Sequence, residues 1–108
     1  HRFGIHAGDI ETSMMLHLAP GIVHMEHAQN FRSTSQDRSE RFAILGNGKS
    51  AKMGWAIEDY HPSGAVGQAD AATADKGRAV VQAAGAALAA LLAEVAALPL
   101  DTVRVAGV

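Results

Sequence analysis

The sequence contains no cysteine, and this absence limits both its covalent and its metal chemistry. A chain without thiols forms no disulfide framework and offers no thiolate to a metal ion. Any bound metal must therefore take histidine, aspartate or glutamate ligands, a set that suits zinc, manganese or iron. The 108 residues, 48% of them hydrophobic, are enough for one small core, which limits the chain to one domain or part of one.

The sequence also lacks a charge excess and a long apolar run. Its 9 basic and 11 acidic residues give a net charge of -2, so it has no electrostatic footprint for nucleic acid. The alanine-rich stretch 79–93 is shorter than the about 20 apolar residues that a membrane span needs, and charged residues flank it. We therefore expect a cytoplasmic protein with neither a nucleic-acid nor a membrane partner.

The segment 4–13, GIHAGDIETS, places an imidazole, two carboxylates and two hydroxyls in a turn ahead of an apolar run. Gly4 and Gly8 have the backbone freedom to let this turn wrap closely around an ion or a substrate. A helix that begins near Asp9 puts Glu11 in its first turn, where the helix dipole favours an anion. This arrangement is typical of a metal or hydrolytic site.

A structural interpretation of the same segment is also open. Asp9 has the position of a helix cap, whose side chain accepts hydrogen bonds from backbone N–H groups. His6 and Glu11 are five residues apart, a spacing that matches no closed metal motif. The helix should bury its apolar residues and stop at Pro20-Gly21. These residues are Met14, Met15, Leu16 and Leu18, while solvent or core positions are expected for His17, His24 and His27.

A second, longer helix is the clearest element in the chain. Thr73 is a plausible N-cap, Asp75 lies in the first turn, and Pro99 ends the pattern. Apolar residues recur every three or four positions, so we expect one face to pack on a sheet. They are Val81, Ala84, Leu88, Leu91, Leu92 and Val95. Small residues such as Gly85 leave room for a subunit contact.

Between the helices the pattern is weaker. Residues 42–45, 53–57 and 103–105 are short apolar runs and are the strand candidates. The polar stretch 31–41 and the turn 46–48 are expected to be exposed loop. Residues 43–50, AILGNGKS, satisfy a relaxed phosphate-loop pattern, but the next apolar run follows too soon to leave room for the helix that such a loop requires. Nucleotide binding is therefore not expected.

Trp55, Asp59 and His61 lie in a second chemical cluster, which the turn Pro62-Ser63-Gly64 closes. In one interpretation the tryptophan fills the core, and Asp59 or Ser63 braces the turn. In the other interpretation this segment returns to the active site and forms a wall of the substrate pocket. The residues alone leave both interpretations open.

Residues 6–16, HAGDIETSMML, followed by Ala19-Pro20 and Val23, resemble the His-Ala/Gly-Gly-x-x-Glu-Thr-Ser signature of the creatininase (creatinine amidohydrolase) family. A second block of similarity contains Gly54-Trp55, Asp59, the run 62–67 (PSGAVG) and the run 72–78 (ATADKGR). The two blocks keep the order and rough separation seen in that family. Together they cover most of residues 4–92.

This resemblance implies an α/β fold, namely the C-terminal part of a three-layer α/β/α arrangement with a long C-terminal helix packed on a sheet. Family members carry a Glu-x-His-Gly segment with a following Asp, and a mid-chain Asn-Gly-His segment, which supply most ligands of a two-metal centre. Neither segment occurs here. We therefore expect residues 1–108 to be the C-terminal portion of a single domain whose N-terminal half is absent, and the 108 residues alone to be inactive.

For the whole protein, the resemblance implies a metal-dependent amidohydrolase that cleaves a C–N bond of a small-molecule amide. A hydroxide activated between two divalent ions, of zinc, manganese or iron, would attack the carbonyl. By motif match, Glu11 would be a metal ligand, and His6 the catalytic residue that shuttles a proton or steadies the oxyanion. Trp55, Asp59 and His61 would bind substrate. A homo-oligomer is implied by resemblance as well.

The chain departs from the creatinine-hydrolysing members at two positions. Those members carry a Trp four residues before the signature His and a Glu immediately before it, where this chain has Arg2 and Ile5. The difference argues against creatinine as the substrate, and Arg2 could serve an anionic one. The alternative to an enzyme is a non-catalytic subunit or binding module that keeps the fold without the chemistry.

Overall fold

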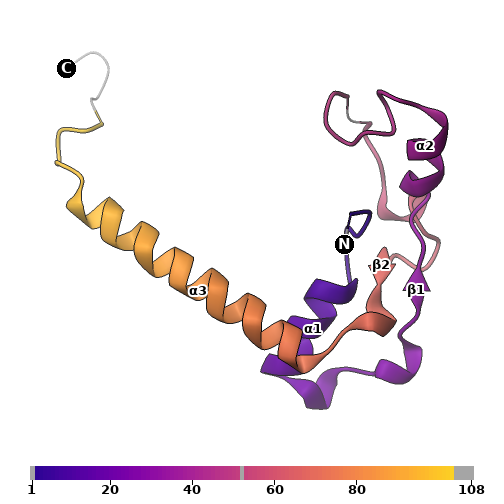
Figure 1. Ribbon diagram of the computed structural model, residues 1–108, viewed down its shortest axis with the longest axis horizontal. Coiled ribbons are helices and arrows are strands. Elements are labelled where there is room, and N and C mark those ends of the chain that lie inside the picture. The colour runs from indigo at the N-terminus through magenta and orange to yellow at the C-terminus, as the bar shows by residue number, and fades with distance from the viewer. Residues whose placement is uncertain (1, 52, 104–108) are drawn as a thin grey trace.

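The computed structural model describes residues 2–51 and 53–103. In these residues three α-helices and a two-residue strand pair alternate with 3-10 turns, and the longest helix projects away from the rest (Figure 1). This is consistent with a piece of an α/β fold. In chain order the elements are α1 (Asp9–Leu18), β1 (Asn30–Phe31), α2 (Ser35–Arg41), β2 (Gly67–Gln68) and α3 (Ala74–Ala97), with 3-10 turns at Pro20–Ile22, Met25–His27, Ile57–Asp59 and Ala69–Ala71.

Helix α1 begins and ends near the predicted positions, but Asp9 is not its cap. Gly8 occupies the N-cap without a side-chain hydrogen bond, and Asp9 is the first helical residue. The helix ends at Leu18, ahead of Pro20, which cannot donate a backbone hydrogen bond. The expected apolar face is only partly buried, because the buried residue of α1 is Ser13.

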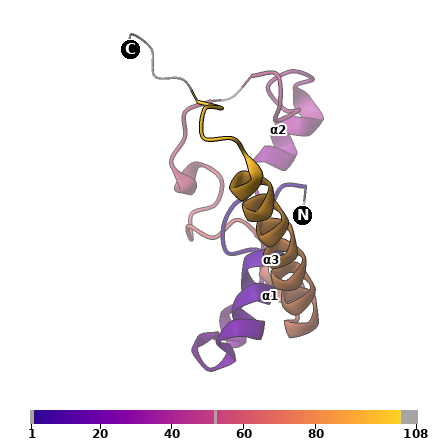
Figure 2. The same cartoon turned by 90° about the vertical axis from the view of Figure 1, so that its left-hand side faces the viewer.

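Ser13 is buried because α1 packs against the first turns of α3, and Figure 2 shows the two helices side by side. Its hydroxyl donates to Asp9 Oδ1 over 3.2 Å and accepts from the backbone N–H of Thr73 over 3.0 Å. Lys76 Nζ lies 3.0 Å from Asp9 Oδ2. Gly77 touches the α1 backbone so closely that a Cβ atom there would collide with the Ser13 carbonyl. The helix crossing therefore joins the two blocks of the sequence signature.

The turn before α1 is held against β2 by backbone contacts. The N–H of Ile5 donates to the carbonyl of Val66 over 2.9 Å, and the N–H of Val66 donates to the carbonyl of His6 over 2.8 Å. Strand β2 pairs antiparallel with β1. Next to this contact, Gly67 has φ of +146°, a conformation that favours glycine. The buried apolar residues of the described chain gather here and are few: Val66, Ala69 and Ala72.

Helix α3 has the predicted boundaries but does not pack as predicted. Thr73 Oγ1 accepts from the backbone N–H of Lys76 over 3.3 Å, and the helix ends at Ala97, two residues before Pro99. From residue 82 onward every helical residue is exposed. The expectation that α3 packs on a sheet is therefore wrong for the described chain, because its strand pair is only two residues long and α3 packs on α1.

The exposed helix gives the molecule an open shape. Its radius of gyration is 19.0 Å, whereas a compact domain of 100 residues has about 13 Å. Because α3 has 24 residues and a mean hydropathy of 1.8 in its most apolar window, it is long and apolar enough to cross a membrane by length and composition. The whole helix, unlike the stretch 79–93 considered in the sequence analysis, therefore meets the length criterion for a membrane span.

The middle of the chain differs most from the sequence-based expectation. Residues 42–45 and 53–57 form turns, irregular backbone and the start of a 3-10 turn rather than strands, whereas the turn at 46–48 is confirmed. The expected loop 31–41 contains the end of β1 and the whole of α2. Polar contacts stabilise this segment, among them a 2.7 Å ion pair between Arg32 and Asp37. Val103 is not in a strand, and residues 104–105 lie outside the described residues.

Candidate functional site

His6 and Glu11 lie together at the start of α1. The Nδ1 atom of His6 is 3.7 Å from Oε2 of Glu11, and both side chains are largely open to solvent, with 61% and 50% of their surfaces exposed. This separation is longer than a hydrogen bond and within the range of an ion pair. The two side chains that the signature singles out are therefore neighbours in space, because only Ala7 and Gly8 separate His6 from the helix whose first turn carries Glu11.

The turn itself is strained at Ala7, whose φ of 53° is in the left-handed region that non-glycine residues rarely adopt. Such a conformation costs about 1–3 kcal/mol and persists where neighbouring contacts fix it. Two contacts do so here: the N–H of Ala7 donates to Glu11 Oε2, and Thr12 Oγ1 donates to the Ala7 carbonyl over 3.3 Å. Glu11 therefore braces the turn with one oxygen, and its hydrogen bonds among the described residues do not involve Oε1.

His6 and Glu11 open onto a cavity of about 440 Å³. Two histidines that the sequence analysis assigned to solvent or core, His24 and His27, line the same cavity. The remaining lining is mostly apolar: Ala7, Thr12, Met15, Ile22, Val23, Met25, Ala28, Phe31, Ala65 and Ala69. After α1 ends, two 3-10 turns at Pro20–Ile22 and Met25–His27 lead toward β1, and they bring His24 and His27 to the cavity. The sequence predicted the break at Pro20-Gly21 but not the direction that the chain takes after it.

The carboxylate of Glu26 lies beside the His24–His27 pair. His24 Nδ1 is 3.1 Å from Glu26 Oε1, and the rings of His24 and His27 are 6.2 Å apart between centroids. A hydrogen bond from the backbone lowers the pKa of Glu26, and the hydrogen bond with His24 lowers it further. Of the two imidazole–carboxylate pairs, His6 and Glu11 both line the cavity, whereas His24 lines it and Glu26 does not.

The described residues do not by themselves make a metal centre. Imidazole and carboxylate are suitable donors for zinc, manganese or iron, and His6 and Glu11 offer one of each. However, no group of three or more His, Asp or Glu residues in 2–51 and 53–103 is arranged to hold a metal ion. A divalent ion at Glu11 would need further ligands from outside these residues.

The three predicted substrate-binding residues do not line the His6 cavity. Trp55 is 48% exposed and packs edge-to-face on Tyr60, with 4.9 Å between ring centroids, so it is not a core residue. Asp59 Oδ2 accepts from the backbone N–H of Ala56 over 2.8 Å, and His61 Nδ1 is 2.7 Å from Ser63 Oγ. Asp59 and Ser63 thus brace their turns, as the structural interpretation predicted.

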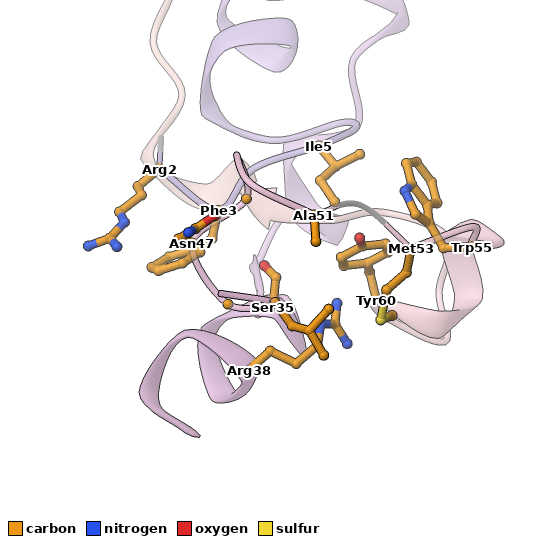
Figure 3. A pocket seen from close by; sticks show the side chains of 13 residues that line it. Arg2, Phe3, Ile5, Ser35, Arg38, Asn47, Ala51, Met53, Trp55 and Tyr60 are labelled. Atoms are coloured by element: carbon orange, nitrogen blue, oxygen red, sulfur yellow. The ribbon is translucent and has the colours of Figure 1, made fainter. Parts of the chain in front are cut away.

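Trp55 instead lines a second cavity of about 430 Å³ (Figure 3). This cavity lies between the N-terminal segment, α2 and the irregular segment after it. Ile5 lines this cavity, whereas the next residue, His6, lines the first. In this extended segment, which bridges to Val66, successive side chains point to opposite sides, so neighbouring residues serve different cavities.

Comparison with known proteins gives two findings. The family model described as creatinine amidohydrolase matches residues 1–92. A crystal structure of a protein provisionally assigned as a creatinine amidohydrolase, from Bacteroides fragilis, is similar with 32% sequence identity and a TM-score of 0.70. The similarity covers 91% of the present chain and 37% of that protein. No curated protein gives a significant match.

Proposed function

Because the chain belongs to the creatinine amidohydrolase family, we propose that it forms the acid–base side of an amidohydrolase site that cleaves a C–N bond of a small-molecule amide. The observation that carries this proposal is the His6–Glu11 pair, which a strained turn holds at the edge of a cavity. Backbone strain of this kind is concentrated at functional sites. The family membership supports amide hydrolysis in general, and the residue roles below are proposed.

His6 is suited to proton transfer. Hydrolysis of an amide requires a proton on the departing nitrogen, and an imidazole takes up and releases protons near neutral pH. The Glu11 carboxylate beside Nδ1 stabilises the positive charge that the ring gains when it takes a proton, and it leaves Nε2 available to the substrate. The mostly apolar lining of the cavity offers a surface against which the apolar part of a small amide can pack.

Metal dependence is part of the proposal. Two bound divalent ions would supply an activated hydroxide and polarise the amide carbonyl. The ions would be zinc, manganese or iron. In this chain Glu11 would hold one ion through Oε1, since Oε2 already accepts from Ala7. The other ligands would come from residues outside the 108.

The test compares variants of the full-length protein on a panel of small-molecule amides. We expect His6→Ala to lower kcat by about 10²–10⁴, as is typical for loss of a positioned acid or base, with bound metal unchanged. Glu11→Gln should lower metal content, because it removes the charge of a ligand. His17→Ala is the matched control, since His17 is an exposed histidine of α1 outside the cavity lining, and it should change neither quantity.

The alternative is a non-catalytic subunit or binding module. One observation favours it: Glu11 already has a structural role as the acceptor of the Ala7 N–H. In that case Glu11→Gln would alter the melting temperature but not metal content, and the wild-type protein would hydrolyse none of the amides at any metal concentration. This result would remove the enzymatic proposal.

A further inference from the structure

The second cavity is lined by two cations and no carboxylate. Arg2 and Arg38 are its charged lining residues within the described chain. The other lining residues are neutral: Phe3, Ile5, Ser35, Leu45, Gly46, Asn47, Gly48, Ala51, Met53, Trp55 and Tyr60. An enclosed surface with charge of one sign attracts ligands of the opposite sign. This lining therefore favours an anionic ligand.

Arg38 offers such a ligand an unused hydrogen-bond donor. Its Nη1 donates to Thr34 Oγ1 over 3.2 Å, and its guanidinium carbon lies 4.8 Å from the centre of the Tyr60 ring. Its Nη2 is buried and has no hydrogen-bond partner among the described residues. A buried donor without an acceptor costs free energy, which a ligand oxygen would recover. Because arginine is long and flexible, a small movement of the guanidinium would bring this nitrogen to the ligand.

Beside Arg38 the cavity presents an apolar wall. Ile5, Met53 and Trp55 are large apolar residues that remain exposed, and they gather around the Tyr60 ring in Figure 3. Arg2 lies at the opposite end of the cavity from Trp55. Apolar walls with a few convergent polar groups are the usual composition of a small-molecule site. The ligand should therefore join an anionic group to an apolar or aromatic one.

Hydrogen bonds fix the wall of the cavity that the segment after α2 forms. Gly46 donates its N–H to the Phe42 carbonyl over 3.0 Å, and a Cβ atom at Gly46 would collide with carbonyls of this helix end. The side chain of Asn47 then accepts from the N–H groups of Lys49 and Ser50 over 2.8 and 2.9 Å. These contacts hold the segment after α2 in place beside Arg38.

We propose that this cavity binds a small organic carboxylate that carries an aromatic or branched apolar group. An oxygen of the carboxylate would accept from Arg38 Nη2, and the apolar group would pack on Trp55 and Tyr60. A carboxylate carries one delocalised charge and is attached directly to the apolar group, so it suits this lining. A phosphate would need more hydrogen-bond donors. This carboxylate site lies in a different cavity from His6 and goes beyond the proposed amidohydrolase function.

The test measures equilibrium binding to the full-length protein by calorimetry, with phenylacetate and its neutral analogue phenylacetamide as probes. Wild type should bind phenylacetate at least about tenfold more tightly, the effect of one charge-assisted hydrogen bond. Arg38→Gln should abolish this preference, and Arg38→Lys should retain part of it. Arg41→Gln is the matched control, because Arg41 belongs to α2 but stacks on Phe42 and does not line the cavity.

Trp55→Ala gives a second readout that does not depend on Arg38. It should weaken both probes by a similar factor, because it removes the apolar wall and leaves the guanidinium. Equal binding of the two probes to wild type, or equal loss in the Arg38→Gln and Arg41→Gln proteins, would overturn the proposal. Binding does not require turnover, so a protein that prefers phenylacetate yet hydrolyses no amide would contradict the proposed function and retain this site.

Discussion

At the scale of single residues, the candidate site depends on what each carboxylate oxygen of Glu11 contacts. Oε2 accepts from the strained Ala7 backbone, and the same atom lies 3.7 Å from the His6 ring. One carboxylate oxygen thus fixes the turn and lies within ion-pair range of the imidazole that the turn presents. This double use explains why a short signature contains both a histidine and a glutamate, and why the effects of their substitutions should not be additive.

The lowered pKa of Glu26 predicts how the stability of the protein depends on pH. Its folded-state pKa lies below the ordinary value of 4.5 because of its backbone and His24 hydrogen bonds. A lowered carboxylate pKa stabilises the folded state above that ordinary value, and this stabilisation is lost as the pH falls through the folded-state pKa. We therefore expect Glu26→Gln to be less stable than wild type at pH 6 and the difference to shrink below about pH 4.5. Urea unfolding of both proteins across this range is the measurement.

The Glu26 prediction has an internal control in Glu94, an exposed carboxylate of α3. Glu94→Gln should leave the pH dependence of unfolding as it is in wild type. A stability difference for Glu26→Gln that stays constant from pH 6 to pH 3 would show that the His24 and backbone contacts do not favour the charged carboxylate.

At the scale of secondary-structure elements, the crossing of α1 and α3 joins the two halves of the described chain. It depends on a buried hydroxyl, Ser13, and on a glycine, Gly77, where the helix backbones meet. Glycine normally weakens a helix, so its presence in the first turns of α3 reflects the close approach. The crossing positions α1, and α1 in turn positions Glu11.

Gly77→Ala tests this crossing. In an exposed helix position, glycine to alanine stabilises by about 1 kcal/mol. At Gly77 the new Cβ would collide with the Ser13 carbonyl, so we expect destabilisation of about 1–3 kcal/mol instead. The measurement is denaturant unfolding of the full-length protein, followed by circular dichroism.

Gly85→Ala is the matched control on the same helix, because nothing lies within 4 Å of a Cβ atom built there. It should stabilise the protein. If Gly85→Ala destabilised the full-length protein as strongly as Gly77→Ala, a surface outside these residues would have to pack on that turn. The subunit contact for which the small residues leave room would then gain support. If Gly77→Ala were stabilising, the crossing would be looser than described.

At the scale of the whole molecule, the described residues leave a large apolar surface without a partner. Leu88, Leu91, Leu92 and Val95 are all more than half exposed along one helix. Exposed apolar area of this extent marks a surface that another part of a protein covers. We propose that a homo-oligomer, which the family resemblance implied, covers part of this surface. Further residues of a longer chain would be another cover, since the similar Bacteroides fragilis protein extends well beyond the matched region.

The 108-residue chain should by itself hydrolyse no amide. The physical reason is that its described residues bring together no group of three possible metal ligands, so an activated hydroxide has no centre to form on. The measurement is product formation from the amide panel by the purified chain with added zinc, manganese or iron. Turnover that depends on the added metal would contradict the prediction and would require a ligand set within these residues.

The sequence by itself determined the features that depend on neighbours along the chain. Thr73 caps α3 and Pro20 follows the end of α1, because caps and prolines act on backbone groups a few residues away. His6 and Glu11 lie near each other for the same reason, since a single turn joins them. The family signature is also a pattern of residues close together along the chain, and the family match over residues 1–92 confirms the resemblance.

Only the tertiary structure decided which apolar runs are buried and which polar residues meet. Residues 42–45 and 53–57 have strand-like composition but find no strand to pair with among residues 2–51 and 53–103, so they form turns and irregular backbone. His24 reaches the His6 cavity, and Arg38 joins Arg2 in the other, through contacts between distant segments. Burial and convergence of side chains depend on surfaces far apart in the sequence, and no local pattern of residues specifies those surfaces.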